Sequence, residues 1–522
     1  MPANSHARLS CAGWKYLPRG FPRLLQYSPG CRIGKHARRI ENQIVATGFQ
    51  TGYAKAALAN RFEVLKHSGY LLLAKLFVRL ASVPFLVYVA SSLGPSMFGV
   101  FAFVLATVEI VSSIGDFGLS RYGTRVMVRE EKDHARFAGI LLSMQLATSL
   151  LLAGTGIAVV LFSAPESPKL QVLLLGLVAV ILSAFTYTTE TVFAATHHFS
   201  ASALLTVIGR LIYLAAGFAV LGLGYSVVAV MWAFVGSIAI ESLVRMIYTA
   251  TRVTRFSFSF TLGEVRHVAR GTLPFAVTSI ASLVYFRADT IVIGIVRGDL
   301  DVGIYGAAYS FFSFFMWLPI VINKVLLPDL TAHYRDDPKE AELTTWYWYR
   351  AMAVAGVAIA FTMTVLARPI IATLMPDTYA DSIIVLQILM WTIPTLMMVS
   401  TGFQSLTVCD REKTGAHTSV ISAALIVALD VALIPHYGPR GAAVAMVITT
   451  ALWEVMTHWL LVKYVLAPRH GLLSVFSMPV LGGGCMALVA LAVSGYGPFA
   501  SLAAGLSVYA AVVLMLRFLE RR

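Results

Sequence analysis

Charge is the scarcest property of this 522-residue sequence, because only 13% of its residues are charged and 58% are hydrophobic. An ordinary soluble domain carries about 25% charged residues. A soluble chain with so little charge would expose large apolar patches, so a lipid bilayer is the expected solvent.

Cysteine is also rare, and two kinds of site motif are missing. The four cysteines form no CxxC pair and no spacing of metal ligands, which argues against a structural disulfide and against a metal site. No GxxxxGK[ST] loop occurs, so ATP hydrolysis by this chain is not expected. We therefore predict a protein that is not an enzyme and needs no cofactor, although its action can be coupled to H⁺ or Na⁺.

Long apolar runs are what the chain has in abundance. A spanning helix needs about 20 mostly apolar residues. On that basis the sequence predicts an all-α polytopic membrane protein with about fourteen transmembrane helices, in two six-helix lobes followed by two C-terminal helices. The expected spans lie near 70–91, 98–120, 138–162, 170–193, 204–222, 227–248, 271–296, 303–327, 351–375, 383–405, 418–435, 441–464, 472–493 and 497–516.

The expected domains follow from these spans. Residues 1–69 are basic and lack an apolar run, so they are predicted to be a disordered cytoplasmic tail and not a signal peptide. Residues 70–250 and 271–465 would form the two lobes, with 251–270 as a cytoplasmic linker between them. Residues 466–522 would supply helices thirteen and fourteen and a cytoplasmic end.

The net charge of +14 comes mainly from short segments between apolar runs. Cytoplasmic loops of membrane proteins carry such an excess of Lys and Arg, so the pattern predicts the inner membrane as the location and places both termini in the cytoplasm. Binding of nucleic acid is not expected. The predicted inside loops hold, among others, Arg121, Arg125, Arg129, Arg136, Arg252, Arg255, Arg266 and Arg270.

A short pattern occurs twice, at an offset of 204 residues. GPSMFGVF begins at Gly94 and GDLDVGIY begins at Gly298, and each lies at a predicted outside turn between two spans. Six helices per repeat is an even number, so both lobes would enter the membrane in the same sense. They would then be related by an axis along the membrane normal, with the substrate held between them.

The same two hairpins carry a family resemblance. LGPSMFGVFAF with DFGLSR (Asp116–Arg121), RADTIVIGIVRGDLDVGIYGAAY (Arg287–Tyr309) and HYGPRGAAVA (His436–Ala445) resemble bacterial polysaccharide exporters and O-antigen flippases. These belong to the multidrug/oligosaccharidyl-lipid/polysaccharide (MOP) superfamily. The resemblance implies a flippase that moves an oligosaccharide on undecaprenyl diphosphate to the outer leaflet. It also implies a role in making a surface polysaccharide, such as lipopolysaccharide O-antigen or exopolysaccharide, with a polysaccharide polymerase and glycosyltransferases as candidate partners.

Cations inside the spans are the candidate cargo ligands. A charge near the bilayer centre costs about 2.5–3.5 kcal/mol on insertion scales, so it usually faces a cavity or a partner. Arg287 has no evident local partner, and its planar fork of donors suits the oxygens of a diphosphate. The predicted cationic cavity comprises Arg287, Arg79, Lys75, Arg210 and Lys324.

Acids inside the spans are candidates for ion coupling or gating. These are Asp289, Glu109, Asp116, Glu190, Asp430 and Glu454. A plainer interpretation pairs Arg79 with Glu109 and Lys75 with Asp116 in salt bridges of the first hairpin, since each pair lies at similar depth. Glu241 and Arg245 are four residues apart and can pair with each other.

Two other functions stay open at this point. An ion-coupled multidrug exporter of the same superfamily would favour an acidic cavity for organic cations. A membrane glycan polymerase or ligase would need a sizeable outside loop with catalytic residues. The predicted outside loops have only about 4–10 residues, which disfavours the enzyme.

Overall fold

The computed structural model describes residues 49–129, 133–163, 168–319, scattered positions between 322 and 334, 338–466, 471–492 and 498–520. The chain divides into two compact units, Met1–Lys66 and His67–Arg522, and the second is the subject here. Most of the predicted tail 1–69 lies outside the described residues. Within the described ranges the protein is helical and contains no strand.

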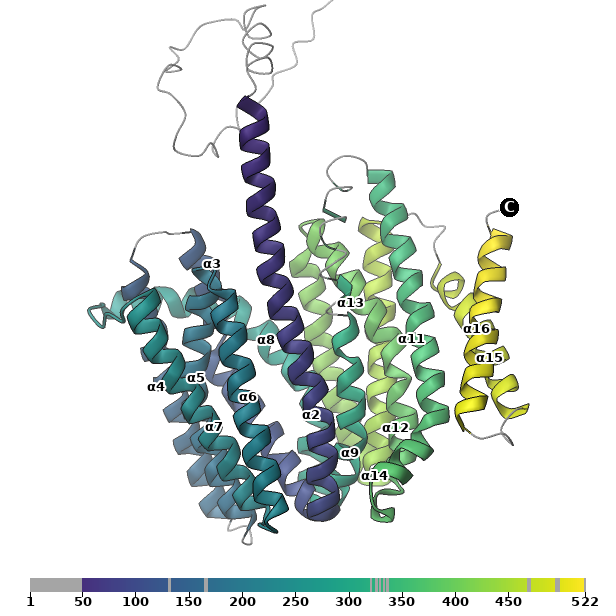
Figure 1. Ribbon diagram of the computed structural model, residues 1–522, viewed down its shortest axis with the longest axis horizontal. Helices are drawn as coiled ribbons and strands as arrows, with labels where there is room; N and C mark the ends of the chain where they lie inside the picture. The colour runs from purple at the N-terminus through teal and green to yellow at the C-terminus, as the bar shows by residue number, and fades with distance from the viewer. Residues whose placement is uncertain are drawn as a thin grey trace, which may run out of the picture. The chain divides into compact units, whose positions relative to one another are not determined.

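Helices follow one another through the whole described chain (Figure 1). The first half comprises α2 (Phe49–Asp116), α3 (Leu119–Arg129), α4 (His134–Ser163), α5 (Lys169–Ala195), α6 (Phe199–Gly222) and α7 (Val227–Tyr248), followed by the π-helix η2 (Thr249–Val253). The second half comprises α8 (Leu262–Val296), α9 (Asp299–Phe315), α11 (Pro338–Leu374), the 3₁₀ turn η3 (Asp377–Tyr379), α12 (Ser382–Met390), α13 (Thr392–Val408) and α14 (Glu412–Tyr464). Helices α15 (Leu472–Ala492) and α16 (Pro498–Glu520) complete the chain.

Ten helices of the described part are long and apolar enough to cross a membrane, which confirms the predicted all-α membrane fold. Two of them pass through a predicted turn. The backbone leaves the helical region at Gly94 in α2 (φ 72°) and at Gly438 in α14 (φ 57°), a conformation that favours glycine. Across the second turn, Trp453 Nε1 donates to Thr418 Oγ1 at 3.1 Å, so the two arms of α14 lie side by side. The count of fourteen spans stays a prediction.

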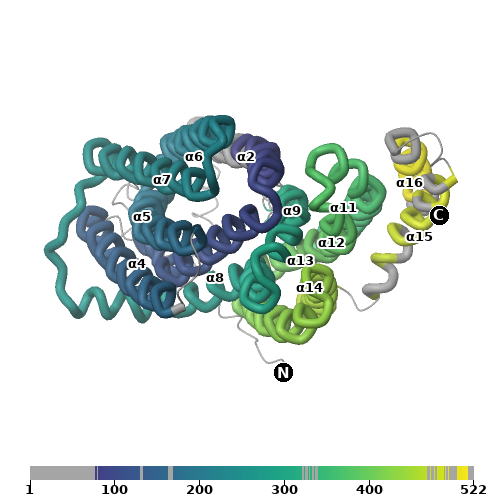
Figure 2. Tube along the Cα trace, turned by 90° about the horizontal axis from the view of Figure 1, so that it is seen from below, coloured from purple at the N-terminus to yellow at the C-terminus, as the bar shows by residue number. Residues whose placement is uncertain are grey.

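Helices pack mainly within each half. In the first half, α5 contacts both α4 and α7, and α6 contacts α7. In the second half, α14 packs along α8 and α13, and α13 packs along α11. Figures 1 and 2 show α4–α7 as one group and α9 with α11–α14 as another, and α15 and α16 lie side by side and contact α11.

Two ends of the helix bundle differ in their chemistry. At the end that we call the glycine end, the turns at Gly94, Gly298 and Gly438 come together. There a Cβ on Gly438 would lie 3.2 Å from Asp301, and Gly99, five residues after Gly94, packs on the backbone of Asp299. The opposite end, called the arginine end, comprises residues 121–129, 133–136 and 252–270. These segments are joined by the Ser257 N–H donating to Ala135 O at 3.0 Å and by the ion pair of Arg136 with Glu264 at 2.9 Å.

Candidate functional site

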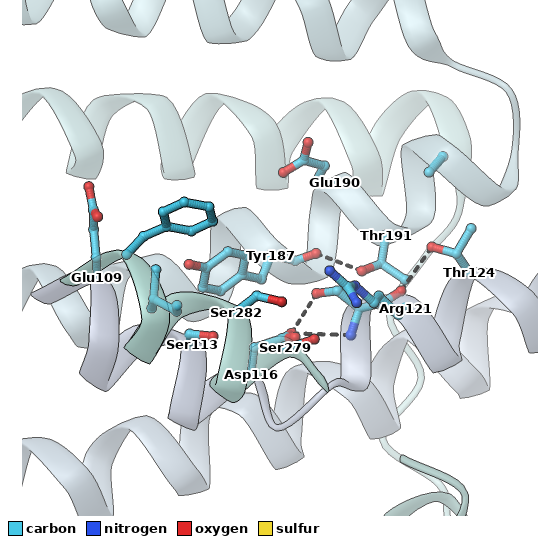
Figure 3. Close-up of a pocket in the computed structure, with 14 residues that line it drawn as sticks. Glu109, Ser113, Asp116, Arg121, Thr124, Tyr187, Glu190, Thr191, Ser279 and Ser282 are labelled. Atoms are coloured by element: carbon cyan, nitrogen blue, oxygen red, sulfur yellow. Dashed lines mark hydrogen bonds between the residues drawn. The ribbon is translucent and has the colours of Figure 1, made fainter. Parts of the chain in front are cut away.

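A cavity of about 760 Å³ lies between the two halves. Its walls come from the second arm of α2, from α3 and α5, and from α8. Figure 3 shows Glu109 at one end of the cavity, Arg121 and Thr124 at the other, and Tyr187 between them. The lining residues are Glu109, Ser113, Asp116, Ser120, Arg121, Thr124, Tyr187, Glu190, Thr191, Ala194, Ser279, Ser282, Leu283 and Phe286.

Glu109 is paired with Arg287 across the two halves. Arg287 Nε lies 2.5 Å from Glu109 Oε2 and Nη2 lies 3.0 Å from Oε1, so both carboxylate oxygens accept from the fork. The guanidinium also stacks over the Tyr309 ring at 5.0 Å. The side chains keep 24% (Arg287) and 47% (Glu109) of their surface exposed. The sequence offered no local partner for Arg287, because this one comes from a helix 178 residues away.

Asp116 is held by neutral donors. It ends α2, where Phe117 (φ 47°) and Gly118 (φ 72°) turn the chain into α3. Its Oδ1 accepts from Ser120 Oγ at 2.5 Å and from Gln145 Nε2 at 2.7 Å, and Thr188 donates in turn to Gln145 Oε1. The sequence analysis did not single out Gln145. Its amide is isolated within the apolar run 138–162, and this could have indicated a polar contact, because a buried amide needs hydrogen-bond partners.

The described lining is more acidic than the sequence analysis expected. Glu109, Asp116 and Glu190 face one arginine, Arg121, and Arg287 adds a second positive charge through Glu109. Tyr187 and the serines of α8 also line the cavity and were not singled out from the sequence, because hydroxyl residues are common in membrane helices. The described part of the structure does not include the side chains of three of the five predicted cationic residues, Lys75, Arg79 and Lys324. The salt bridges predicted for Lys75 and Arg79 therefore also lie outside the described part.

Arg210 lies apart from the cavity lining. Its guanidinium donates to Ser82 Oγ at 2.8 and 3.1 Å and lies over the Tyr213 ring at 5.1 Å. The two hydrogen bonds to Ser82 join α6 to the first arm of α2. Elsewhere in the first half, Arg245 pairs with Glu241 at 2.8 Å, which confirms the i,i+4 pair.

Two predicted coupling acids, Asp289 and Asp430, are buried in the second half. Both have 0% exposure. Asp289 accepts from the Thr290 backbone N–H at 2.6 Å and from the hydroxyl of Tyr305. Neither carboxylate oxygen of Asp430 has a hydrogen-bond partner among the residues that the structure describes. A buried charge without a partner is costly, so this position favours a bound proton or cation.

Glu454 is a third buried acid, on the second arm of α14. It is 1% exposed and accepts from the Tyr349 hydroxyl, while its Oε2 has no hydrogen-bond partner in the described part of the chain. The Tyr349 ring stacks on His458 at a centroid distance of 5.7 Å. No group of three or more His, Cys, Asp or Glu side chains placed to hold a metal ion occurs among the described residues.

Comparison with known proteins identifies the family. The family model described as "Polysaccharide biosynthesis protein" matches residues 64–332, just over half of the chain. The chain belongs to this family. The family resemblance seen in the two hairpins is therefore confirmed. No curated protein matches the sequence.

Solved structures share this fold at low sequence identity. "Lipid II flippase MurJ, inward closed conformation" aligns with a TM-score of 0.72 and 15% identity over 87% of this chain and 99% of that chain. An inward-facing multidrug resistance MATE family transporter of the MOP superfamily aligns with a TM-score of 0.60 and 14% identity, over 74% and 93%. A MOP superfamily transporter from Pyrococcus furiosus gives 0.54 and 15%, over 76% and 94%. These likenesses establish the fold.

Proposed function

We propose that this protein is a flippase for an oligosaccharide linked to undecaprenyl diphosphate, working by alternating access between its two halves. The observation that carries the proposal is the polar cavity between the halves, walled by helices that are otherwise apolar. A charged sugar headgroup needs such a polar path, while its polyprenyl tail can stay in lipid. The polysaccharide biosynthesis family supports a glycan as cargo.

Arg287 is the proposed ligand of the diphosphate. In the structure the guanidinium of Arg287 is paired with the Glu109 carboxylate. A diphosphate presents oxygens to the same fork of donors and would displace Glu109. The displaced carboxylate is 47% exposed and can turn into the cavity, where water solvates it. Binding of cargo and breaking of a contact between the halves would then be one event.

The arginine end is proposed to face the cytoplasm, with both termini inside and the glycine end outward, following the distribution of basic residues. The cavity lining reaches Arg121, Thr124 and Ala194, towards the arginine end. Cargo would therefore enter from the side on which glycosyltransferases build it. A polysaccharide polymerase on the other side would be the natural consumer of the flipped product.

Asp289 and Asp430 are the proposed coupling acids. Both are buried, Asp430 lacks a hydrogen-bond partner in the described part, and a gradient of H⁺ or Na⁺ could load them from one side. Glu454 and Glu190 are secondary candidates, the first buried with Tyr349 and the second in the cavity wall. No further cofactor is proposed.

One observation favours a second candidate, an ion-coupled multidrug exporter. The described lining holds three acids and one arginine, and acidic walls suit small organic cations. The family match favours the glycan over this alternative.

The test is the sidedness of undecaprenyl-diphosphate-linked glycan in cells depleted of this protein. A flippase predicts that the glycan accumulates on the cytoplasmic leaflet and that re-expression reverses this. An unchanged distribution, in cells without a redundant flippase, would reject the glycan and leave drug-resistance profiles of the same strain as the next measurement.

A further inference from the structure

The two copies of the internal repeat touch each other at the glycine end. An ideal Cβ on Gly99, in α2, would lie 1.7 Å from the backbone O of Asp299, which begins α9. An ideal Cβ on Gly303, in α9, would lie 1.9 Å from the backbone O of Pro95, just after the turn of α2. Gly99 and Gly303 are equivalent positions of the repeat, at the same offset of 204 residues. Each glycine therefore packs directly on the first turn of the other repeat.

The obstacle at these glycines is the backbone of a neighbouring helix and not the end of a movable side chain. A carbonyl oxygen in the first turn of a helix cannot move without moving the helix. Real Cβ atoms essentially never approach other heavy atoms within 3.0 Å, so any larger residue at either position must separate the two halves here. Both glycines lie within helices, so their conformation does not require glycine, and the close approach does.

Other contacts between the halves gather around this point. Lys169 of α5 pairs with the Asp299 side chain at 2.5 Å. The Tyr379 hydroxyl donates to Ala90 O at 2.8 Å, and Ser91 Oγ donates to Leu374 O at 3.1 Å. The glycine end is thus sealed by contacts between backbones and polar groups, while the cavity lining extends towards the arginine end.

We infer that the contacts of Gly99 and Gly303 close the transport path at the glycine end, and we call these contacts the outer seal. Because neither position carries a side chain, the two helices approach closely, and this close approach sets the stability of the conformation that is closed to the outside. The inference rests on the proposed alternating access and adds to it the residues that close one side. Cargo release outward would require these two helix turns to part. A methyl group at either glycine would disfavour the closed state and shift the population towards outward-open conformations.

A pair of introduced cysteines, one helical turn beyond Gly99 and Gly303, can report whether the seal is closed. An ideal Cβ on Gly306 lies 3.3 Å from the Cβ of Ala102, close to the Cβ separation of about 3.5–4.5 Å in disulfides. We would combine Ala102→Cys with Gly306→Cys in full-length protein whose four native cysteines are replaced by serine. Oxidation with copper phenanthroline should link α2 to α9 in most molecules. A second reporter, Ser282→Cys, measures labelling of the cavity by a membrane-impermeant maleimide added outside intact cells.

Gly99→Ala and Gly303→Ala should each lower the rate of disulfide formation, and raise outside labelling of the cavity cysteine, by about tenfold, which corresponds to a shift of about 1.4 kcal/mol. Gly154→Ala and Gly236→Ala are the matched controls, because a Cβ at either position meets nothing within 4 Å, and they should change neither readout. Parental values for both readouts in the Gly99 and Gly303 variants would overturn the inference.

A second measurement covers the case in which the alanine variants do not reach the membrane. With both glycines intact, the oxidised Ala102→Cys/Gly306→Cys protein should lose glycan export and recover it on reduction. Full export by completely crosslinked protein would show that the seal never opens in the cycle and would overturn the inference. If the conformational readouts respond but no glycan moves under any condition, the seal stands and the proposed cargo fails.

Discussion

Two charges on α8, only two residues apart, lie in opposite surroundings. Arg287 is on the cavity side, where it pairs with Glu109 and keeps 24% of its side chain exposed. Asp289 turns into the second half, with 0% exposure and bonds to Thr290 and Tyr305. Residues at i and i+2 do not share a helix face, so one helix serves two environments.

The difference in exposure between Arg287 and Asp289 determines what can bind beside each of them. An ion pair beside a cavity lined by polar side chains can exchange its partner for a large anion, because water can solvate the displaced carboxylate afterwards. A carboxylate sealed among helices can exchange only a proton or a small cation, because nothing larger fits. This contrast supports the proposal that cargo binds in the cavity and that the buried acids carry the coupling ion. Because Arg287 and Asp289 both lie on α8, movement of this helix would link the two sites.

The largest effect is expected for Arg287→Ala. The substitution removes the proposed ligand of the diphosphate and leaves Glu109 without the partner seen in the structure. Glycan export should fall about 100-fold, which corresponds to about 2.8 kcal/mol. The measurement is the rate of surface-glycan appearance, normalised to the amount of protein in the membrane.

The matched control for this change is Arg297→Ala. Arg297 also pairs with an acid, Asp301 at 2.9 Å, but it lies at the glycine end with 43% of its side chain exposed. Its loss should change export less than about threefold. If Arg287→Ala exports normally at wild-type membrane levels, Arg287 has no part in cargo binding, and the contrast between Arg287 and Asp289 no longer supports a cargo site beside α8.

The next largest effect is expected for Asp430→Asn. The amide keeps the size of the side chain but cannot take up a proton or pair with a cation, so export should lose its response to the coupling gradient. We expect about a tenfold fall in gradient-driven export, within the range of about 5–150-fold that is typical of coupling between sites. Asp381→Asn, at an exposed acid paired with Arg440, should leave the response intact. An unaltered response to both H⁺ and Na⁺ gradients in Asp430→Asn would argue against the assignment of coupling to this acid.

The sequence predicted the helices well and their partners poorly. Runs of apolar residues and the bias of basic loops depend on local composition, and the turns at Gly94 and Gly298 depend on residues next to each other. The i,i+4 pair of Glu241 with Arg245 was predictable for the same reason. The pairing of Arg287 with Glu109 was not, because no local pattern encodes a contact across 178 residues between two halves.

The internal repeat shows both what the sequence can predict and what it cannot. The offset of 204 residues marked Gly99 and Gly303 as equivalent, yet it did not predict that they touch. Equivalent surfaces near an axis of pseudo-symmetry meet each other, so a repeated small residue at such a surface is a signal of contact between repeats. The acidic character of the described lining was likewise hidden, because which face of α5 carries Glu190 towards the cavity depends on packing.

A smaller effect is expected for Gln145→Leu, which tests the difference between the two cavity acids of the first half, Glu109 and Asp116. Glu109 is held by a cation, whereas Asp116 is held by Ser120 and by Gln145. The substitution removes one hydrogen bond from Asp116 and one from Thr188, while Asp116 keeps Ser120 and Thr188 keeps the Ala184 carbonyl. Each lost hydrogen bond contributes about 0.5–1.5 kcal/mol. Export should fall about fivefold and the melting temperature in detergent should drop.

Gln387→Leu is the control for this change, because Gln387 donates to a backbone carbonyl, Thr364 O, in the second half and away from the cavity. It should lower stability without a matching loss of export per folded molecule. Equal losses of export in the two variants would mean that the Gln145 network serves folding alone.

The smallest effect is expected for Lys169→Met. This substitution breaks an ion pair between the halves that resembles the Arg287–Glu109 pair but lies in a different place. Lys169 and Asp299 also join the two halves, at 2.5 Å, with 24% and 26% of their side chains exposed. This pair lies at the glycine end beside close backbone contacts that remain after the substitution, and partly exposed pairs contribute only about 0.2–1 kcal/mol. Export should therefore change by no more than about threefold, and the effect should shrink as salt rises. A loss as large as that of Arg287→Ala would place the main electrostatic contact between the halves at the seal, and cargo binding would no longer be needed to explain the pair in the cavity.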